Sequence, residues 1–228
     1  MQPQATIDAK NAEFWDELCG TLFARELGIH DRTQQSLQRF DEAYLAFYSY
    51  LASYAPPELV AGKRVLEIGL GYGTLGGLLA SRGAVYHGLD LARGPVEMMR
   101  YRLSLAGVAG ADDRVKQGSA LAIPFPDASF DFVYSIGCLH HTGDTTTAVS
   151  EVRRVLIPGG RAVVMLYNRH SFRQVVQLPI DRLKNRIRRR GRDHDAFVRG
   201  AYDANTAGDA APHTDFVSRR DIGTCQRS

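Results

Sequence analysis

Cysteine is scarce in this sequence, and long apolar runs are lacking. The three cysteines, Cys19, Cys138 and Cys225, are odd in number and far apart, which excludes a disulfide framework and a zinc site of paired cysteines. No apolar stretch approaches the ~20 residues that a membrane span needs. The first ten residues contain no apolar core of a signal peptide, so we expect a cytoplasmic location.

A marked excess of charge of one sign is also lacking. Among 228 residues, 28 Lys and Arg face 25 Asp and Glu, and the net charge is +3. Hydrophobic residues make up 44% of the chain, which excludes a wholly disordered, collagen-like or coiled-coil protein. The balance is uneven in one place, because residues 182–192 (RLKNRIRRRGR) contain seven basic residues and no acid.

The basic segment 182–192 allows three interpretations. A run of like charges is most often a solvated helix face. Ile180, Leu183 and Ile187 lie on one side among arginines, which is typical of an amphipathic helix that contacts anionic lipid. Nucleic-acid binding is less favoured, because no dedicated RNA-binding module accompanies the segment.

Apolar spacing predicts an α/β domain preceded by helices. The first third favours helices over residues 11–27 and 37–51, with Pro56 and Pro57 ending the second. Short apolar strands then alternate with helices, which is typical of βαβ units and a parallel sheet. We expect strands at 64–68, 85–89, 114–117, 130–135 and 161–167, helices at 75–82, 94–105, 145–156, 171–190 and from 215, and a long loop over 191–214.

The strongest motif joins the first strand to the helix after it. Gly69, Gly71 and Gly73 alternate there, and glycines let the chain turn tightly and let a ligand approach the backbone. The N–H groups at the start of the helix favour a negatively charged group. Asp90 ends the next strand, where a carboxylate can accept both hydroxyls of a ribose. The motif therefore predicts a nucleoside-bearing ligand across the carboxyl ends of these strands.

Two residues argue against a dinucleotide as that ligand. Thr74 stands where the dinucleotide fingerprint has its third glycine. Glu67, two residues before Gly69, suits a ligand with an ammonium group better than one with a pyrophosphate. Both features favour an amino-acid-linked nucleoside. An NAD(P)-dependent oxidoreductase is the weaker alternative, since the sequence also lacks a Tyr-x-x-x-Lys pair.

The sequence resembles the class I S-adenosylmethionine-dependent methyltransferases, in the small-molecule group with a type 11-like domain. The resemblance covers about residues 63–167 in the family's order and spacing. The matching segments are VLEIGLGYGT at 65–74, HGLDLA at 87–92, GSALAIPFPDASFDFVYS at 118–135, CLHHTGD at 138–144 and EVRRVLIPGGRAVVM at 151–165. It implies a three-layer α/β/α Rossmann-like fold with sheet order 3-2-1-4-5 and S-adenosyl-L-methionine as the cofactor.

The resemblance implies roles for the residues that end the first strand. Gly69, Gly71 and Gly73 would line the methionine part of the cofactor. Glu67 would either orient this loop or bind the amino group of the cofactor.

The second and third strands would supply the nucleoside contacts. By resemblance, Asp90 would bind the ribose and Leu91 would pack on the adenine. Ser119 and Ala120 stand where the family often has an acidic residue followed by a backbone contact to the adenine amino group. Ser119 departs from that pattern, because its hydroxyl can form a hydrogen bond but carries no charge.

The fourth strand would end beside the reaction. The resemblance implies that Ile136 and Gly137 close the cofactor pocket. His140 and His141 follow, and either could take the proton of a hydroxyl acceptor, with a slight preference for His141, because histidine titrates near neutral pH. The alternative is that both histidines are structural. No metal is expected there, because adjacent histidines do not easily point at one ion.

Aromatic residues gather on the helix predicted over 37–51. Tyr44, Phe47, Tyr48 and Tyr50 could roof the cofactor pocket, but an aromatic stripe at helical spacing is more often core. Tyr72 in the glycine loop either packs against the cofactor or faces solvent.

Two further strands are normal in this family and have no convincing counterpart here. The sole candidate is residues 196–198. We therefore expect a chain that is C-terminally truncated relative to the family, with the fifth strand as an exposed edge that favours self-association.

The sequence thus predicts a helical cap over 1–57, a cofactor-binding core over 58–168 and a helical or loop segment over 169–228. The expected activity is methyl transfer to a small-molecule or lipid-linked acceptor, with oxygen favoured. A non-catalytic cofactor-binding or interaction protein on the same fold is the alternative from a different class.

Overall fold

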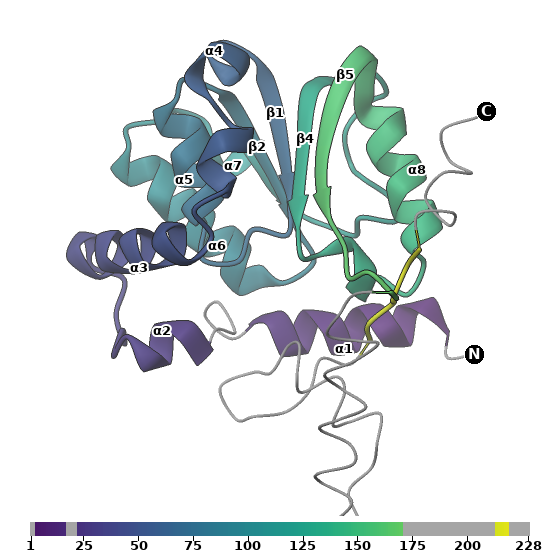
Figure 1. Cartoon of the computed structure of the whole chain (residues 1–228), viewed down its shortest axis with the longest axis horizontal. Coiled ribbons are helices and arrows are strands. Elements are labelled where there is room, and N and C mark those ends of the chain that lie inside the picture. The colour runs from purple at the N-terminus through teal and green to yellow at the C-terminus, as the bar shows by residue number, and fades with distance from the viewer. Residues whose placement is uncertain (1–2, 17–21, 171–212, 219–228) are drawn as a thin grey trace, which may run out of the picture.

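A parallel sheet of five strands forms the centre of the fold (Figure 1). The structure is a computed structural model that describes residues 3–16, 22–170 and 213–218. The strands are β1 (Arg64–Ile68), β2 (Val85–Asp90), β3 (Val115–Gln117), β4 (Phe130–Ile136) and β5 (Leu156–Met165). Their order, β3-β2-β1-β4-β5, confirms the predicted topology.

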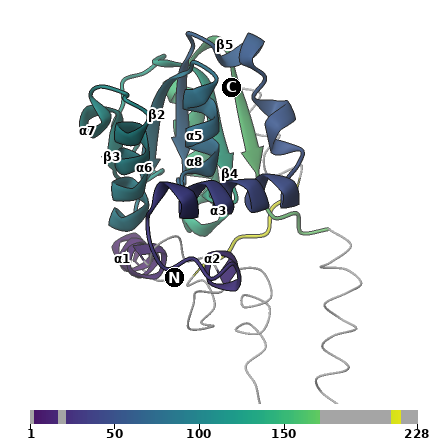
Figure 2. The same cartoon turned by 90° about the vertical axis from the view of Figure 1, so that its left-hand side faces the viewer.

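Both faces of the sheet are covered, which explains the apolar runs of its strands. Val65 packs on the face covered by α5 (Thr74–Ser81) and α6 (Arg93–Leu105). Leu66 and Ile68 point to the other face, against α8 (Thr145–Val155). Figures 1 and 2 show the resulting three layers of helices, sheet and helix.

Most of the N-terminal segment lies along the carboxyl edge and one side of this core, and its last helix lies at the amino edge, next to the start of β1 (Figures 1 and 2). Its helices are α1 (Gln4–Asp16), α2 (Leu22–Glu26), α3 (Gln34–Phe47), the 3-10 turn η2 (Leu51–Tyr54) and α4 (Pro57–Val60). The helix predicted over 11–27 starts earlier, at Gln4, and corresponds to α1 and α2, with residues 17–21 between them outside the described residues. The expected stop at the prolines was wrong as well, because α3 already ends at Phe47 and Pro57 opens α4, where the first turn tolerates proline.

Helix α1 crosses the carboxyl edge of the sheet and contacts both the chain after β4 and the first turn of α6. At one end the side chain of Gln4 donates to the carbonyl of Thr142, 2.7 Å away, in the chain after β4. At the other end Asp16 accepts a 2.7 Å hydrogen bond from the backbone N–H of Gly94 in α6. The edge where ligands bind in open α/β sheets is thus roofed by the N-terminal helix.

One predicted strand boundary needs correction, and two short helices were not predicted. Strand β5 begins at Leu156 rather than residue 161, because the turn around Gly159 (φ +80°) is an irregularity within the β4–β5 pairing and not a break before it. The short helices α7 (Ala111–Arg114) and η3 (Leu139–His141) were not predicted, since neither is long enough to show helical periodicity.

The described part of the segment after residue 212 is extended, so the helix predicted from 215 is wrong for residues 215–218. The backbone N–H of Asp215 donates to the carbonyl of His140 at 2.6 Å, and that of Val217 donates to Tyr167 at 3.0 Å. Val217 pairs with Asn168 in a parallel bridge. These tertiary hydrogen bonds outweigh the local helical pattern.

Several predictions fall outside the described residues. These are the helix over 171–190, most of the loop over 191–214, the basic segment 182–192 and the candidate strand at 196–198. Within the described ranges β5 pairs with β4 alone among the named strands, and no described helix has the length and apolar character for a membrane crossing. The division at residues 57 and 168 stays a prediction.

Candidate functional site

The glycine loop after β1 adopts a backbone that only glycine accepts without strain. Gly69, Gly71 and Gly73 have φ angles of +84°, +49° and +76°. A Cβ added to Gly69 would lie 2.4 Å from the Cβ of Cys138, so this glycine is required by close packing. A Cβ added to Gly71 would meet no atom within 4 Å. Gly71 therefore leaves the backbone open to an approaching ligand.

Asp90 joins the glycine loop to the loop after β2. One oxygen of its carboxylate accepts a 2.7 Å hydrogen bond from the backbone N–H of Leu70, and the other accepts a 2.9 Å bond from Ala92. Burial raises the pKa of the Asp90 carboxyl to about 6, against the lowering effect of these backbone bonds. Each carboxylate oxygen has a second lone pair, so Asp90 keeps the capacity to accept two hydroxyls.

Glu67 lies beneath the loop on the face covered by α5. Glu67 is 3% exposed, and its carboxyl accepts a 2.5 Å hydrogen bond from the Tyr86 hydroxyl. A Cβ on Gly76 of α5 would lie 2.7 Å from Glu67 Oε2, so α5 can pack on this carboxyl only with glycine there. Burial raises the pKa of Glu67 to about 8, so the carboxyl is largely neutral at pH 7.

The predicted adenine contacts follow β2 and β3. Leu91 is half-buried, and its carbonyl accepts a 3.0 Å bond from Gln117. The Ser119 hydroxyl accepts a 3.2 Å hydrogen bond from the backbone N–H of Leu121, and Ala120 belongs to the core beneath β2 and β4. The backbone N–H of Gly118 donates to the Asp90 carbonyl at 2.8 Å, which keeps this loop beside Asp90.

The end of β4 lies against the end of β5. Ile136 pairs with Met165, and the backbone N–H of Gly137 donates to the Met165 carbonyl at 3.2 Å. Gly137 has a φ of +76°, in the left-handed region that favours glycine, and Cys138 follows it. Burial raises the pKa of the Cys138 thiol to about 12, so this cysteine is a packing residue rather than a nucleophile.

His140 and His141 are buried at 0% and 5% exposure. Nδ1 of His141 lies 2.6 Å from the carbonyl oxygen of His213, which fixes the proton on that nitrogen. The His141 carbonyl accepts a 2.7 Å bond from Asn11 of α1, and the two histidine rings pack on each other and on Tyr167. The structure thus brings both histidines to the carboxyl edge but covers them with α1 and residues 213–215.

The aromatic residues predicted as one stripe divide between the core and the surface, and Tyr44 packs against the buried cluster that includes Phe40. Phe47 is 70% exposed and Tyr50 is 44% exposed, while Tyr44 and Tyr48 are half-buried. Of the two alternatives for Tyr72, the solvent-facing one is wrong, because Tyr72 is 4% exposed and its ring stacks on Phe40 at 3.9 Å between centroids. The fully buried residues of α3 are Leu37 and Phe40.

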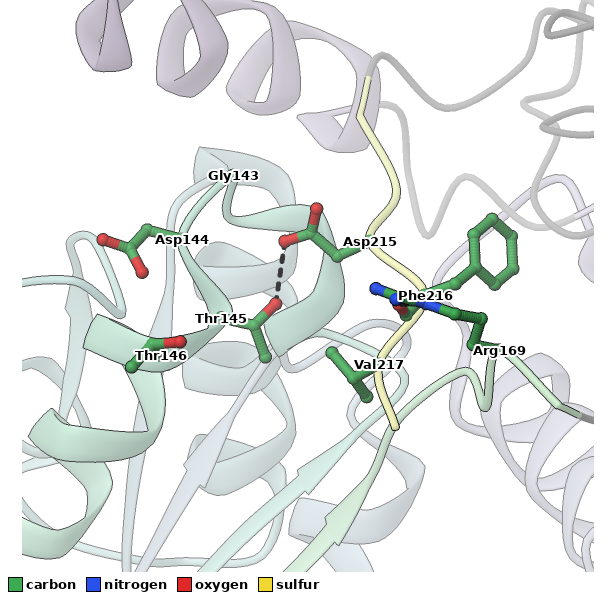
Figure 3. A pocket seen from close by; sticks show the side chains of 8 residues that line it. All are labelled: Gly143, Asp144, Thr145, Thr146, Arg169, Asp215, Phe216 and Val217. Carbon is green, nitrogen blue, oxygen red and sulfur yellow. Dashed lines mark hydrogen bonds between the residues drawn. The ribbon is translucent and has the colours of Figure 1, made fainter. Parts of the chain in front are cut away.

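A hollow of about 460 Å³ lies at the start of α8 (Figure 3). Asp215 accepts a 2.8 Å hydrogen bond from the Thr145 hydroxyl across it. The hollow contains no predicted site residue, and it is lined by Gly143, Asp144, Thr145, Thr146, Arg169, Asp215, Phe216 and Val217.

Sequence reasoning missed two groups of residues at this edge. Asp41 of α3 contacts Thr74 and Arg102 beside the glycine loop. His213 and Asp215 cover the histidine pair. No local pattern marks either group, because their partners lie from 33 to 75 residues away along the chain.

Comparison with known proteins identifies the class that this fold and loop define. Residues 66–164 match the family model of a methyltransferase domain. The chain is 41% identical over 136 residues to a fatty-acid O-methyltransferase of Mycolicibacterium smegmatis, covering 59% of this chain and 46% of that protein. It is 37% identical over 163 residues to a 27-O-demethylrifamycin SV methyltransferase of Amycolatopsis mediterranei, covering 70% and 58%. The chain therefore spans about half the length of the curated relatives it matches.

A solved structure supports the same fold. The geranyl diphosphate C-methyltransferase of Streptomyces coelicolor superposes with a TM-score of 0.61 over 99% of this chain and 79% of that chain, at 13% identity. Together with the matched family model, these relatives support a class I S-adenosylmethionine-dependent methyltransferase domain over residues 66–164.

S-adenosylmethionine is the cofactor of this family, and the described residues fit it. The backbone at Gly71 is open, as a ligand-lining loop requires. The N-cap of α5 is Gly73, so no side chain caps the first turn of that helix. Asp90 can accept further hydrogen bonds on both carboxylate oxygens.

Proposed function

We propose that this chain is a methyltransferase that transfers the methyl group of S-adenosylmethionine to an oxygen of a small-molecule or lipid-linked acceptor. The observation that carries the proposal is the Asp90–Leu70 hydrogen bond within the matched domain, because it holds a ribose-binding carboxylate against the open glycine loop. The oxygen preference draws support from the printed names of the two relatives, which O-methylate a fatty acid and act on a 27-O-demethyl compound.

The cofactor supplies an electrophilic methyl group, and the chain has to hold an acceptor near it. We assign Gly69, Gly71 and Gly73 to the methionine part. Asp90 would bind the ribose. Glu67 is assigned to loop orientation, the first of its two predicted roles, because its carboxyl bonds to Tyr86 beneath the loop.

The remaining cofactor contacts are assigned as the sequence predicts them. Leu91 and Ser119 would lie beside the adenine, with the backbone at Ala120 facing its amino group. Ile136 and Gly137 would close the pocket at the end of β4, where Met165 lies against them.

A base role for His141 or His140 stays a prediction. The burial of both rings and the bond from His141 Nδ1 to a backbone carbonyl favour the alternative, in which they hold α1 and residues 213–215 over the sheet edge. Contact of the basic segment with anionic lipid, self-association through β5 and the exclusion of nucleic acid also stay predictions.

Titration calorimetry with S-adenosylhomocysteine and with NAD tests the cofactor assignment. We expect binding of S-adenosylhomocysteine and none of NAD, because Thr74 replaces the third glycine and its hydroxyl bonds to Asp41. Turnover of S-adenosylmethionine with a panel of fatty acids, phenols and amines then tests the reaction. Methylation of amines alone would contradict the oxygen preference, and binding without any turnover would favour a non-catalytic binding protein.

A further inference from the structure

A buried charged group joins α3 to the glycine loop. Asp41 of α3 accepts hydrogen bonds from both terminal nitrogens of the Arg102 guanidinium, at 2.8 and 2.9 Å. It also accepts a 2.6 Å bond from the hydroxyl of Thr74, the first residue of α5. Arg102 comes from α6 and is 8% exposed. A guanidinium this deeply buried requires a paired carboxylate, so Asp41 is tied to its place.

The residue before Asp41 holds the other side of the loop. Phe40 is 1% exposed and stacks on Tyr72 with an angle of 17° between the ring planes. The guanidinium carbon of Arg102 lies 5.5 Å from the centre of the same Tyr72 ring. Consecutive residues of α3 therefore fix the residues on both sides of Gly73.

The side chain of Arg102 also packs directly against Gly73. A Cβ at Gly73 would lie 2.7 Å from Cδ of Arg102, so the arginine stem crosses where any side chain would stand. Both its positive φ and the path of Arg102 therefore require glycine at position 73.

We propose that Asp41, Arg102 and Thr74 form a loop clamp that positions the glycine loop for the cofactor and couples cofactor binding to the docking of α3. The inference rests on the proposed function, because the ligand of the loop is the cofactor. The three side chains act through the backbone on either side of Gly73 and are positioning residues. Coupling between sites is reciprocal, so a clamp that improves cofactor binding also makes the bound cofactor hold α3 more firmly.

The first test compares the affinity of full-length variants for S-adenosylhomocysteine by calorimetry. Thr74→Val keeps the shape of the side chain but loses the hydroxyl, and Asp41→Asn loses the charge. We expect each to weaken binding about tenfold or more, as loss of a hydrogen bond to a charged group does when it is fully coupled to the ligand. Thr74→Ser restores the hydroxyl and should bind within about threefold of the wild type.

Asp127→Asn is the matched control. Asp127 also pairs with a guanidinium, that of Arg154 at 2.6 Å, but it lies before β4 at the opposite edge of the sheet. Its substitution should leave the affinity unchanged. Equal affinity of wild type, Thr74→Val and Asp41→Asn would overturn the clamp while leaving the proposed function intact.

Hydrogen exchange distinguishes an effect on the positioning of the glycine loop from a general loss of protein stability. In the wild type, S-adenosylhomocysteine should slow amide exchange in peptides covering residues 34–47, and in Thr74→Val this protection should shrink. A variant that melts earlier but keeps the full ligand-dependent protection would overturn the coupling. A folded wild-type chain that binds no S-adenosylhomocysteine would overturn the proposed function, and the clamp with it.

Discussion

The two ends of the carboxyl edge of the sheet are built in different ways. At the β1–β2 end, Asp90 bonds to Leu70, only 20 residues away along the chain. At the β4–β5 end, His141 bonds to Asn11 and His213, 130 and 72 residues away. The first end is a loop motif with its own local geometry, whereas the second is a junction of distant segments. The cofactor end can therefore be recognised from a short stretch of sequence, whereas the other end depends on tertiary packing.

The largest effect is expected at the cofactor end, from Asp90→Ala. The change removes a carboxylate that joins both loops. The affinity for S-adenosylhomocysteine should fall by about 100-fold, which corresponds to the loss of two hydrogen bonds to a charged group. Calorimetry measures the change. Asp131→Asn is the control, because Asp131 also accepts a backbone N–H, that of Arg64 at 2.9 Å, but at the amino edge. Unchanged affinity in Asp90→Ala would refute its ribose role.

Two glycines sharpen the comparison within the same loop. Gly69→Ala places a methyl group against Cys138 and should lower the free energy of unfolding by about 2–4 kcal/mol, from overpacking and the positive φ. Gly71→Ala meets open space and should cost only about 1–2 kcal/mol, from its φ, while weakening cofactor binding.

Urea unfolding and calorimetry measure these two quantities for the glycine variants. The double variant Gly69→Ala/Cys138→Gly should recover part of the lost stability, since it removes the colliding Cβ. Equal losses of stability in the two single variants would contradict the assignment of Gly71 to the ligand side.

The histidine end is tested by two substitutions of His141. Asn can replace the Nδ1 donor toward the His213 carbonyl, whereas Ala cannot. If His141 is a positioning residue, His141→Ala should lose about 1–3 kcal/mol of stability, and His141→Asn should keep most of the stability and the turnover. Both variants should bind S-adenosylhomocysteine as the wild type does. Loss of turnover in His141→Asn with stability intact would instead establish the base role.

The smallest effect, when it is expressed per pH unit, is the dependence of the unfolding free energy on pH that Glu67 contributes. Its pKa is raised to about 8 in the folded chain from an ordinary value of 4.5, because burial disfavours the charged form. The folded state therefore holds this proton more tightly, and the stability that it contributes is complete below pH 4.5 and is lost as the pH rises to about 8. The slope is at most about 1.4 kcal/mol per pH unit.

Unfolding free energies measured from pH 5 to 8 should fall less steeply for Glu67→Gln than for the wild type. Glu151→Gln is the control of opposite sign, because the hydrogen bond from Arg154 lowers the pKa of Glu151 and its contribution is lost only as the pH falls. Parallel curves for wild type and Glu67→Gln would show that Glu67 is ionised in the folded chain.

The sequence alone determined the sheet, its strand order and the local form of the cofactor loop. Buried strands such as Arg64–Ile68 carry apolar side chains for both faces, and alternating glycines leave the backbone few other conformations. These signals lie within a few residues of one another, so they can be interpreted without knowledge of the rest of the chain.

Tertiary structure decided what surrounds that loop. The clamp of Asp41 on Arg102 and Thr74, the burial of Tyr72 and the extended path of residues 213–217 over the histidines all join distant segments. A single residue such as Asp41 or Asp215 looks like any exposed carboxylate in the sequence. Its partner exists only after folding, because hydrogen bonds and buried charges are satisfied by whichever groups the packed chain brings within reach.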